Sequence, residues 1–158
     1  VSIISGTELV DEVPVGDNVV IIGDDEHMQS LGTADFLAER GKKVEVLCKG
    51  YYCGAKIEPA TRMTIYQRLL QKGVTLTPLT GVKEISGSTV TVYNVFTNKE
   101  RRIEGVDTVV VGCGGQEDNG LYYALKDRVK EIYRVGDANG VRKIFDATMD
   151  GATLARAL

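Results

Sequence analysis

The sequence predicts an α/β fold in which a three-strand β-meander is inserted into a parallel β-sheet. Three observations lead to this prediction. Continuous β-branched runs are typical of strands buried on both faces, stretches with helical apolar spacing end at glycine, and one segment changes to an apolar period of two. The chain of 158 residues is 43% hydrophobic and 26% charged, which is the composition of an ordinary globular protein.

The first β-α-β unit lies near the N-terminus. Residues 19–22 form a continuous apolar strand that ends at Gly23, and residues 44–47 are predicted to be the second strand. The segment between them has apolar residues at helical spacing and ends at Gly41, in the C′ position that glycine favours. Because crossover connections are right-handed, we expect the two strands to be parallel neighbours in a Rossmann-like sheet.

The middle of the chain adds a second helix and the meander. Residues 61–72 are predicted to be helical, with Gly73 closing the helix. The apolar period then changes to two, and short strands alternate with turn residues over 74–76, 82–85, 89–95 and 101–103. Residues 107–111 return to the continuous apolar pattern of the parallel sheet.

The C-terminal part is predicted to hold three elements. Residues 121–127 are expected to form a short helix, residues 132–135 a strand that stops at Gly136, and residues 144–158 a terminal helix. The inward side of that last helix is expected to consist of Ala147, Met149, Leu154, Ala155 and Leu158.

Composition excludes several classes of function. The net charge is −3 and the pI about 5.3, with scattered Lys and Arg, so no nucleic-acid-binding surface is predicted. No apolar run approaches the about 20 residues that a membrane helix needs. The three cysteines are an odd number without Cys-x-x-Cys spacing, which favours a cytoplasmic protein without a metal site. The single histidine, His27, has no Ser or Cys nucleophile motif near it, so no catalytic residue is predicted.

The turn after the first strand is where a Rossmann-like domain docks a dinucleotide pyrophosphate. Gly23 is a candidate cofactor-binding residue there, but the G-x-G-x-x-G pattern does not continue. Asp24, Asp25 and Glu26 instead place three consecutive carboxylates where the phosphates would bind. Like charges at that range repel by about 1 to 4 kcal/mol per pair. The sequence therefore favours a nucleotide-binding fold that has lost its ligand, although Lys49 leaves open a weak site for a 2′-phosphate.

Gly136 and Asp137 are a second candidate for nucleotide contact. They follow an apolar run and precede the terminal helix. Glycine lets the backbone turn against a ligand, and a carboxylate accepts hydrogen bonds from sugar hydroxyls. A helix N-cap at Asp137 would look the same in the sequence, so both interpretations stay open.

These segments, taken in order, carry a family resemblance over nearly the whole chain. They comprise residues 19–47, the helix closed by Gly73, the meander, residues 107–114, residues 133–137, Asp146-Ala147 and Asp150-Gly151. They resemble the C-terminal region of the NADH:flavin oxidoreductase family of trimethylamine dehydrogenase and bacterial 2,4-dienoyl-CoA reductase. Its members join an FMN-bearing TIM barrel and a 4Fe-4S cluster to paired nucleotide domains. The reductases carry FAD and use NADPH, whereas the amine dehydrogenases hold ADP in the FAD position and pass electrons to an electron-transfer flavoprotein.

The resemblance implies how the chain is divided and which residues face cofactors. Residues 1–115 would form an NAD(P)-type nucleotide-binding-like domain, and residues 116–158 the returning part of an FAD-type domain. Gly112 and Gly114 match the Ala-Thr-Gly element that follows the last strand of the NAD(P)-type domain. Gly136 and Asp137 match the Gly-Asp pair of the FAD-type domain. The carboxylate-rich loop is of the degenerate kind found in members that do not use a nicotinamide.

The resemblance also implies that this chain is a C-terminal fragment of a multidomain FMN/iron–sulfur flavoprotein oxidoreductase. The barrel, the cluster cysteines and the first β-α-β unit of the FAD-type domain are absent from the sequence. We expect no catalysis and no tightly bound cofactor in the fragment; FMN, the 4Fe-4S cluster and FAD or ADP would belong to the parent. Its partners would be the rest of the parent flavoprotein and an electron-transfer flavoprotein, and exposed apolar faces favour a homo-oligomer. Two alternatives stay open: a working NADPH-binding domain of an enoyl reductase that uses Lys49, and a ligand-free interaction module.

Overall fold

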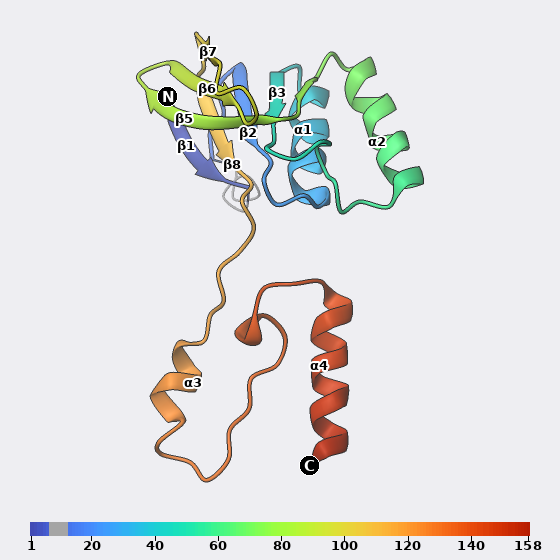
Figure 1. Cartoon of the computed structure of the whole chain (residues 1–158), viewed down its shortest axis with the longest axis vertical. Coiled ribbons are helices and arrows are strands. Elements are labelled where there is room, and N and C mark those ends of the chain that lie inside the picture. The colour runs from blue at the N-terminus through green and yellow to red at the C-terminus, as the bar shows by residue number, and fades with distance from the viewer. Residues whose placement is uncertain (7–12) are drawn as a thin grey trace. The chain divides into compact units, whose positions relative to one another are not determined.

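The computed structural model describes residues 1–6 and 13–158 of the chain. These residues divide into two compact units, Val1–Cys113 and Gly114–Leu158. The first unit contains all eight strands that the described residues form, together with the helices α1 and α2 (Figure 1). The second unit contains α3, a short 3₁₀ helix and α4.

A five-stranded parallel sheet forms the centre of the first unit. Its strands, in spatial order, are β1 (Ser2–Ser5), β8 (Thr108–Val111), β2 (Asn18–Ile22), β3 (Lys43–Leu47) and β4 (Thr75–Thr77). Val20 of β2 lies opposite Val109 on one side and Glu45 on the other. The predicted parallel pairing of the first two strands is therefore confirmed. The edge strand β1, which the sequence analysis did not predict, pairs with β8.

Two helices pack against one face of this sheet. α1 (Met28–Glu39) buries Leu31, Ala34 and Leu37, and α2 (Pro59–Gln71) buries Ile65 and Leu69 in the same apolar cluster. Val19 and Ile21 of β2 belong to that cluster as well. Both helices stop before a glycine in the left-handed region, with φ of 77° at Gly41 and 76° at Gly73, as the C′ prediction requires.

The meander covers the opposite face. β5 (Thr80–Ser86), β6 (Thr89–Asn94) and β7 (Glu100–Ile103) form an antiparallel sheet in chain order, so the predicted three-strand insert is confirmed. Val90 and Val92 of β6 pack with Val20 of β2. Since alternate residues of a strand point to opposite faces, β2 contributes Val20 to the meander side and its neighbours to the helix side.

One short strand has a different partner from the one expected. Residues 74–76 carry the period-two pattern that was assigned with the meander, but β4 pairs in parallel with β3, with Leu76 opposite Val46. Three residues of alternating polarity are too few to specify a partner strand. The partner of β4 is instead set by the backbone hydrogen bonds that it forms with β3.

The second unit contains α3 (Gly120–Leu125), the 3₁₀ helix η1 (Gly136–Asn139) and α4 (Ile144–Ala157). The two helices agree with prediction, whereas the strand predicted at 132–135 is wrong, because no strand exists among the described residues of this unit for it to pair with. None of the residues in α3, η1 and α4 is buried.

The predicted inward side of the last helix is therefore only partly correct. Ala147 and Leu154 are half-buried, but Met149, Ala155 and Leu158 are exposed. Leu121 is 73% exposed and Ile144 88% exposed, so the unit presents large apolar side chains to water. No described side chain of this unit is fully buried, so α3 and α4 leave apolar side chains exposed.

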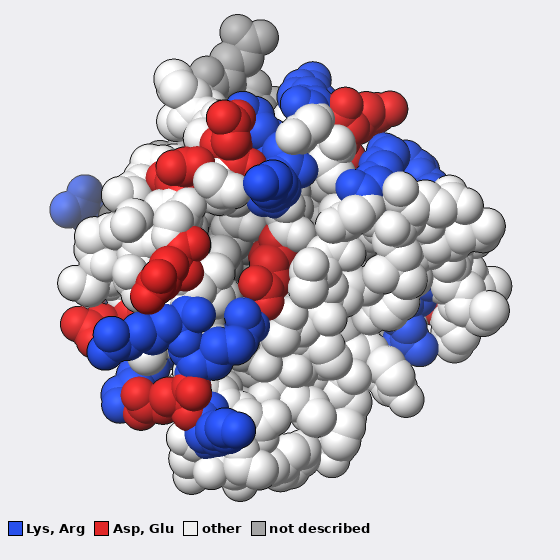
Figure 2. Space-filling model, turned by 90° about the horizontal axis from the view of Figure 1, so that it is seen from above, with Lys and Arg blue, Asp and Glu red and all other residues white. Residues whose placement is uncertain are grey.

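Charges of both signs are mixed on the molecular surface. Figure 2 shows Lys and Arg groups beside Asp and Glu groups on the face that it presents. This mixture agrees with the net charge of −3, and it gives no extended basic face in that view. Within the described residues, the longest helices are too short and too polar to span a bilayer.

Candidate functional site

The carboxyl ends of β2 and β8 lie next to each other at the start of α1. The Gly23 amide donates to the Leu47 carbonyl at 2.8 Å, and the Gly112 amide donates to the Ile22 carbonyl at 2.7 Å. The Gly112 carbonyl in turn accepts the Asp25 amide at 3.0 Å. The structure thus brings together two residues that the sequence analysis had assigned to cofactor binding, Gly23 and Gly112.

Ser30 of α1 packs against both glycines. A Cβ on Gly23 would lie 3.1 Å from the Ser30 Cβ, and a Cβ on Gly112 would lie 2.3 Å from the Ser30 Oγ. Close packing of the helix on the sheet therefore requires glycine at these positions without any ligand, and the nucleotide contact stays a prediction. The sequence analysis gave Ser30 no role, although a small residue in the first turn of the helix was an available signal.

The acidic loop engages the lysines that flank it. The Asp24 carboxylate accepts the Lys49 amide at 3.0 Å and lies 3.1 Å from the Lys49 Nζ. The hydrogen bond and charge of Asp24 raise the pKa of Lys49. Glu26 makes a matching pair with Lys56, with 3.0 Å between the carboxylate and Nζ. Neither pair is predictable from the sequence, because the members of each pair are distant in the chain.

Asp25 lies between Asp24 and Glu26 in the chain, and the residue is half-buried. Burial raises the pKa of Asp25, while the Ser30 hydroxyl, which donates to its Oδ1 at 2.8 Å, and the charge of His27 oppose that rise. Three carboxylates therefore occupy the helix entrance, where a pyrophosphate would need an electropositive environment. The residues present do not fit a nicotinamide dinucleotide at this loop.

Side chains that could ligate a metal are dispersed over the residues that the structure describes. No group of three or more His, Cys, Asp or Glu side chains there is arranged to hold an ion.

Cys48 directly follows β3, the position at which nucleotide-binding Rossmann domains carry an acidic residue for the ribose. The buried Cys53 is its neighbour in space, with the two sulfurs 3.2 Å apart.

The other predicted residues belong to the second unit. Gly114 begins this unit and has a φ of 84°. Gly136 has a φ of 61°, and a Cβ there would lie 3.2 Å from the Ala147 Cβ, so α4 and η1 approach closely. These contacts do not test cofactor binding, so the binding roles of Gly114, Gly136 and Asp137 stay predictions.

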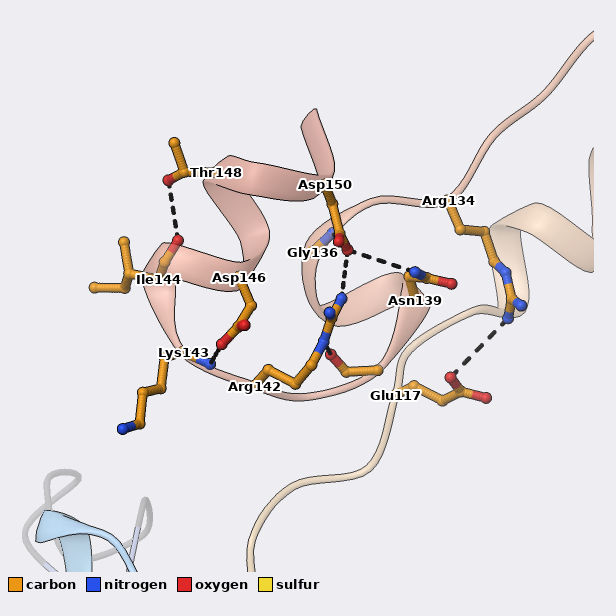
Figure 3. Close-up of polar contacts among 11 residues, drawn as sticks. Glu117, Arg134, Gly136, Asn139, Arg142, Lys143, Ile144, Asp146, Thr148 and Asp150 are labelled. Atoms are coloured by element: carbon orange, nitrogen blue, oxygen red, sulfur yellow. Dashed lines mark hydrogen bonds and ion pairs between the residues drawn. The ribbon is translucent and has the colours of Figure 1, made fainter. Parts of the chain in front are cut away.

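Asp150 of α4 holds the turn around Gly136 (Figure 3). Its carboxylate accepts the Gly136 amide at 3.2 Å and the Asn139 side-chain amide at 3.4 Å, and it pairs with Arg142. The Arg142 guanidinium lowers the pKa of Asp150. The sequence analysis gave Asp150 no role in the site.

An open hollow of about 510 Å³ lies at the start of α4, between Asp137 and Lys143. The Lys143 amide at the start of α4 already donates to the Asp146 carboxylate at 3.1 Å, and the Asp137 carboxylate can accept hydroxyl groups. The hollow can therefore accept a hydroxyl-bearing group, and contact between Asp137 and a cofactor stays a prediction.

Comparison with known proteins finds similar regions in several dehydrogenases and reductases. No protein-family model matches the chain. A metal reductase from Desulforamulus reducens is 35% identical over 111 residues, which is 70% of this chain and 16% of that protein. The N,N-dimethylglycine/sarcosine dehydrogenase of Chromohalobacter salexigens is 33% identical over 121 residues, covering 73% of this chain and 17% of the dehydrogenase.

A solved structure shows the same fold. The histamine dehydrogenase from Rhizobium sp. 4-9 matches with a TM-score of 0.91 at 24% identity, over 99% of this chain and 26% of the dehydrogenase. This chain therefore spans only about a sixth to a quarter of the length of the proteins that it resembles.

Proposed function

The chain belongs to the family of flavoprotein oxidoreductases that includes trimethylamine dehydrogenase and 2,4-dienoyl-CoA reductase, and we propose that it is the C-terminal nucleotide-domain region of a larger enzyme of this family. In this proposal residues 1–115 are the NAD(P)-type domain and residues 116–158 the returning part of an FAD-type domain. The parent enzyme transfers hydride or electrons at FMN, and the FMN and the 4Fe-4S cluster lie outside this chain.

The functional part of the proposal rests on one observation, which is the ion pair between Lys49 and Asp24. Lys49 is the cation next to the ribose position, and its ammonium lies 3.1 Å from the Asp24 carboxylate. A 2′-phosphate would have to displace that carboxylate and also approach Asp25 and Glu26. We therefore assign this domain a structural role in place of nicotinamide binding, as in an amine dehydrogenase that passes electrons to a flavoprotein carrier.

The second unit would complete the neighbouring cofactor domain. Gly136 and Asp137 would contact the ADP or FAD of the parent, and the hollow beside Asp137 is consistent with that contact. The exposed apolar side chains of α3 and α4, among them Leu121 and Ile144, would be covered by the part of the FAD-type domain that this chain lacks. On its own the fragment is inactive.

Reduction of the parent flavin tests this proposal. The full-length protein that contains this chain is mixed anaerobically with NADPH or with candidate secondary and tertiary amines, and flavin bleaching is followed by absorbance. We expect an amine to reduce the flavin and NADPH to leave it oxidised.

A matched variant sharpens the test. Lys49→Glu in the full-length protein should leave amine-dependent bleaching unchanged, because Lys49 is not expected to contact a nucleotide. Rapid bleaching by NADPH that Lys49→Glu abolishes would overturn the proposal and identify a reductase of the enoyl type.

A further inference from the structure

Cys48 and Cys53 form a buried thiol pair with no part in the proposed function. Their sulfurs lie 3.2 Å apart, and the residues are 2% and 1% exposed. Both are free thiols. Four residues separate them in the loop that leaves β3, so the pair is local in the chain and enclosed by the first unit.

The backbone on both sides holds the two sulfurs in place. The Cys48 amide donates to the Thr77 carbonyl at 3.2 Å, and the Cys48 carbonyl accepts the Thr80 amide at 2.8 Å. The Cys53 carbonyl accepts the Tyr66 hydroxyl at 2.8 Å. Gly54 follows with a φ of 73°, and a Cβ there would lie 2.5 Å from the Ile57 Cδ1, so this tight turn directs Cys53 inward.

The environment gives the two thiols different roles. The hydrogen bond between them lowers the pKa of Cys48 and, together with burial, raises the pKa of Cys53. The thiolate is the nucleophilic form of cysteine, so the lower pKa favours Cys48 over Cys53 as an attacking group. Cys113 of the same unit provides a comparison. The residue as a whole is exposed, but partial desolvation of its sulfur, together with the charge of Asp24, raises the pKa of Cys113.

We propose that Cys48 and Cys53 are a redox-active dithiol that a small hydroperoxide converts into a disulfide. The Cys48 thiolate attacks one peroxide oxygen, the O–O bond breaks, and the departing hydroxide is protonated to water, which leaves a sulfenic acid on Cys48. The Cys53 sulfur then attacks the Cys48 sulfur, the S–S bond forms, the S–O bond breaks, and a second water leaves. The two cysteines together lose two electrons and hydrogen peroxide gains them.

The burial of Cys48 and Cys53 limits which oxidants can reach their sulfurs. Both sulfurs are shielded from bulk solvent, so a small peroxide can reach them more easily than a bulky disulfide such as glutathione disulfide. Closing the bond requires the sulfurs to approach from 3.2 Å to the about 2.05 Å of a disulfide. This inference is independent of the proposed function.

Peptide mapping of the 158-residue chain tests the proposal directly. Trypsin cleaves after Lys43, Lys49 and Lys56, so Cys48 and Cys53 fall in separate peptides, 44–49 and 50–56, and Cys113 falls in a third. The reduced chain is treated with hydrogen peroxide, blocked with an alkylating reagent and digested without reductant. We expect peptides 44–49 and 50–56 to be joined, with two of the three thiols lost and Cys113 alkylated.

Variants identify the chemistry. Cys113→Ser should give the same cross-link as the unchanged chain. Cys53→Ser should give no cross-link and should retain a sulfenic acid on Cys48, which dimedone traps once the peroxide-treated chain is unfolded in urea. Separate alkylated peptides 44–49 and 50–56 after the peroxide treatment, or a cross-link to Cys113, would overturn the proposal. The map of the unchanged chain decides this even where a variant does not fold.

Discussion

The Lys49 ammonium lies 3.1 Å from the Asp24 carboxylate, and the same carboxylate accepts the Lys49 backbone amide at 3.0 Å. Asp24 follows β2 and Lys49 follows β3, so the pair joins the ends of two neighbouring strands at the nucleotide edge of the sheet. In a nucleotide-binding domain these strand ends hold the pyrophosphate and the ribose. In this chain Asp24 and Lys49, which follow these strands, pair with each other instead.

Nicotinamide binding should therefore be weak and limited by Asp24. We expect calorimetric titration of the chain with NADPH to show no binding in the micromolar range. Asp24→Asn frees Lys49 and removes one repulsive charge, which is expected to improve the affinity about fivefold, the effect of about 1 kcal/mol. Asp17→Asn, which breaks the distant ion pair with Lys42, should change nothing. Micromolar binding by the unchanged chain would contradict the assignment.

Gly112 is expected to be indispensable to packing. In Gly112→Ala the new Cβ would meet the Ser30 Oγ at 2.3 Å and the Ile22 carbonyl at 3.1 Å, so we expect a loss of about 1 to 3 kcal/mol in unfolding free energy by urea denaturation. Gly32→Ala is the matched control, because no atom lies within 4 Å of its Cβ in α1. It should stabilise the chain by about 0.5 to 1 kcal/mol through helix propensity.

A double variant separates the contacts of Gly112. Ser30→Ala removes the Oγ that the new Cβ would meet, so Ser30→Ala combined with Gly112→Ala should recover part of the loss relative to Gly112→Ala alone. Simple addition of the two losses would show that the Ser30 contact is not the cause.

Asp35 is expected to stabilise the contact between α1 and α2. This residue is 8% exposed and pairs with Arg68 and with Lys72, the latter at 2.8 Å. Asp35→Ala removes both charge-assisted hydrogen bonds from a buried position, and we expect a loss of about 2 kcal/mol in unfolding free energy. Glu39→Ala also removes a partner of Lys72, but its side chain is 68% exposed and 3.8 Å away, so the loss should stay below about 0.5 kcal/mol. Equal losses would refute this role.

The buried carboxyl of Asp25 should make stability depend on pH. Burial raises the pKa of Asp25 above its ordinary value of 3.8, so the folded chain binds more protons than the unfolded chain in the range just above that value. The contribution of Asp25 to stability therefore falls as the pH rises through this range. Thermal unfolding from about pH 3 to 7 should show Asp25→Asn gaining stability relative to the unchanged chain as the pH rises.

Asp107 provides a control of opposite sign for this pH series. Its carboxylate accepts the Asn18 amide at 2.8 Å, and this hydrogen bond lowers the pKa of Asp107. The stability it contributes is present above the unfolded pKa and is lost as the pH falls through the folded pKa. Asp107→Asn should therefore lose stability relative to the unchanged chain as the pH rises. The same trend in both variants would contradict the burial argument.

The isolated chain should self-associate through its second unit. Ile144 is 88% exposed and Phe145 70% exposed at the start of α4, and Leu121 of α3 is 73% exposed. Sedimentation velocity is expected to show oligomers that grow with concentration, and Ile144→Ser with Phe145→Ser should shift the chain towards monomer. Met63→Ser, which removes a single exposed side chain of the first unit, should not. A monomer at every concentration would count against a missing partner surface.

The sequence by itself determined the elements whose signals are local. The apolar runs of β2, β3 and β8, the helical spacing before Gly41 and Gly73, and the period-two pattern of the meander each specify a conformation within a few residues. The glycines at both helix ends are predictable for the same reason, since their left-handed φ is a property of one residue.

Only the tertiary structure decided which of these elements and side chains are partners. The sequence of a short strand such as β4 does not specify its partner strand, and the segment at 132–135 has strand-like residues but forms no ladder with the residues that the structure describes. Lys49 and Asp24 are 25 residues apart and meet only because β2 and β3 are adjacent. The contact of Cys48 with Cys53 likewise depends on the path of one loop. Pairing is a property of the folded chain because hydrogen bonds and ion pairs act over a few ångströms in space, whatever the separation in sequence.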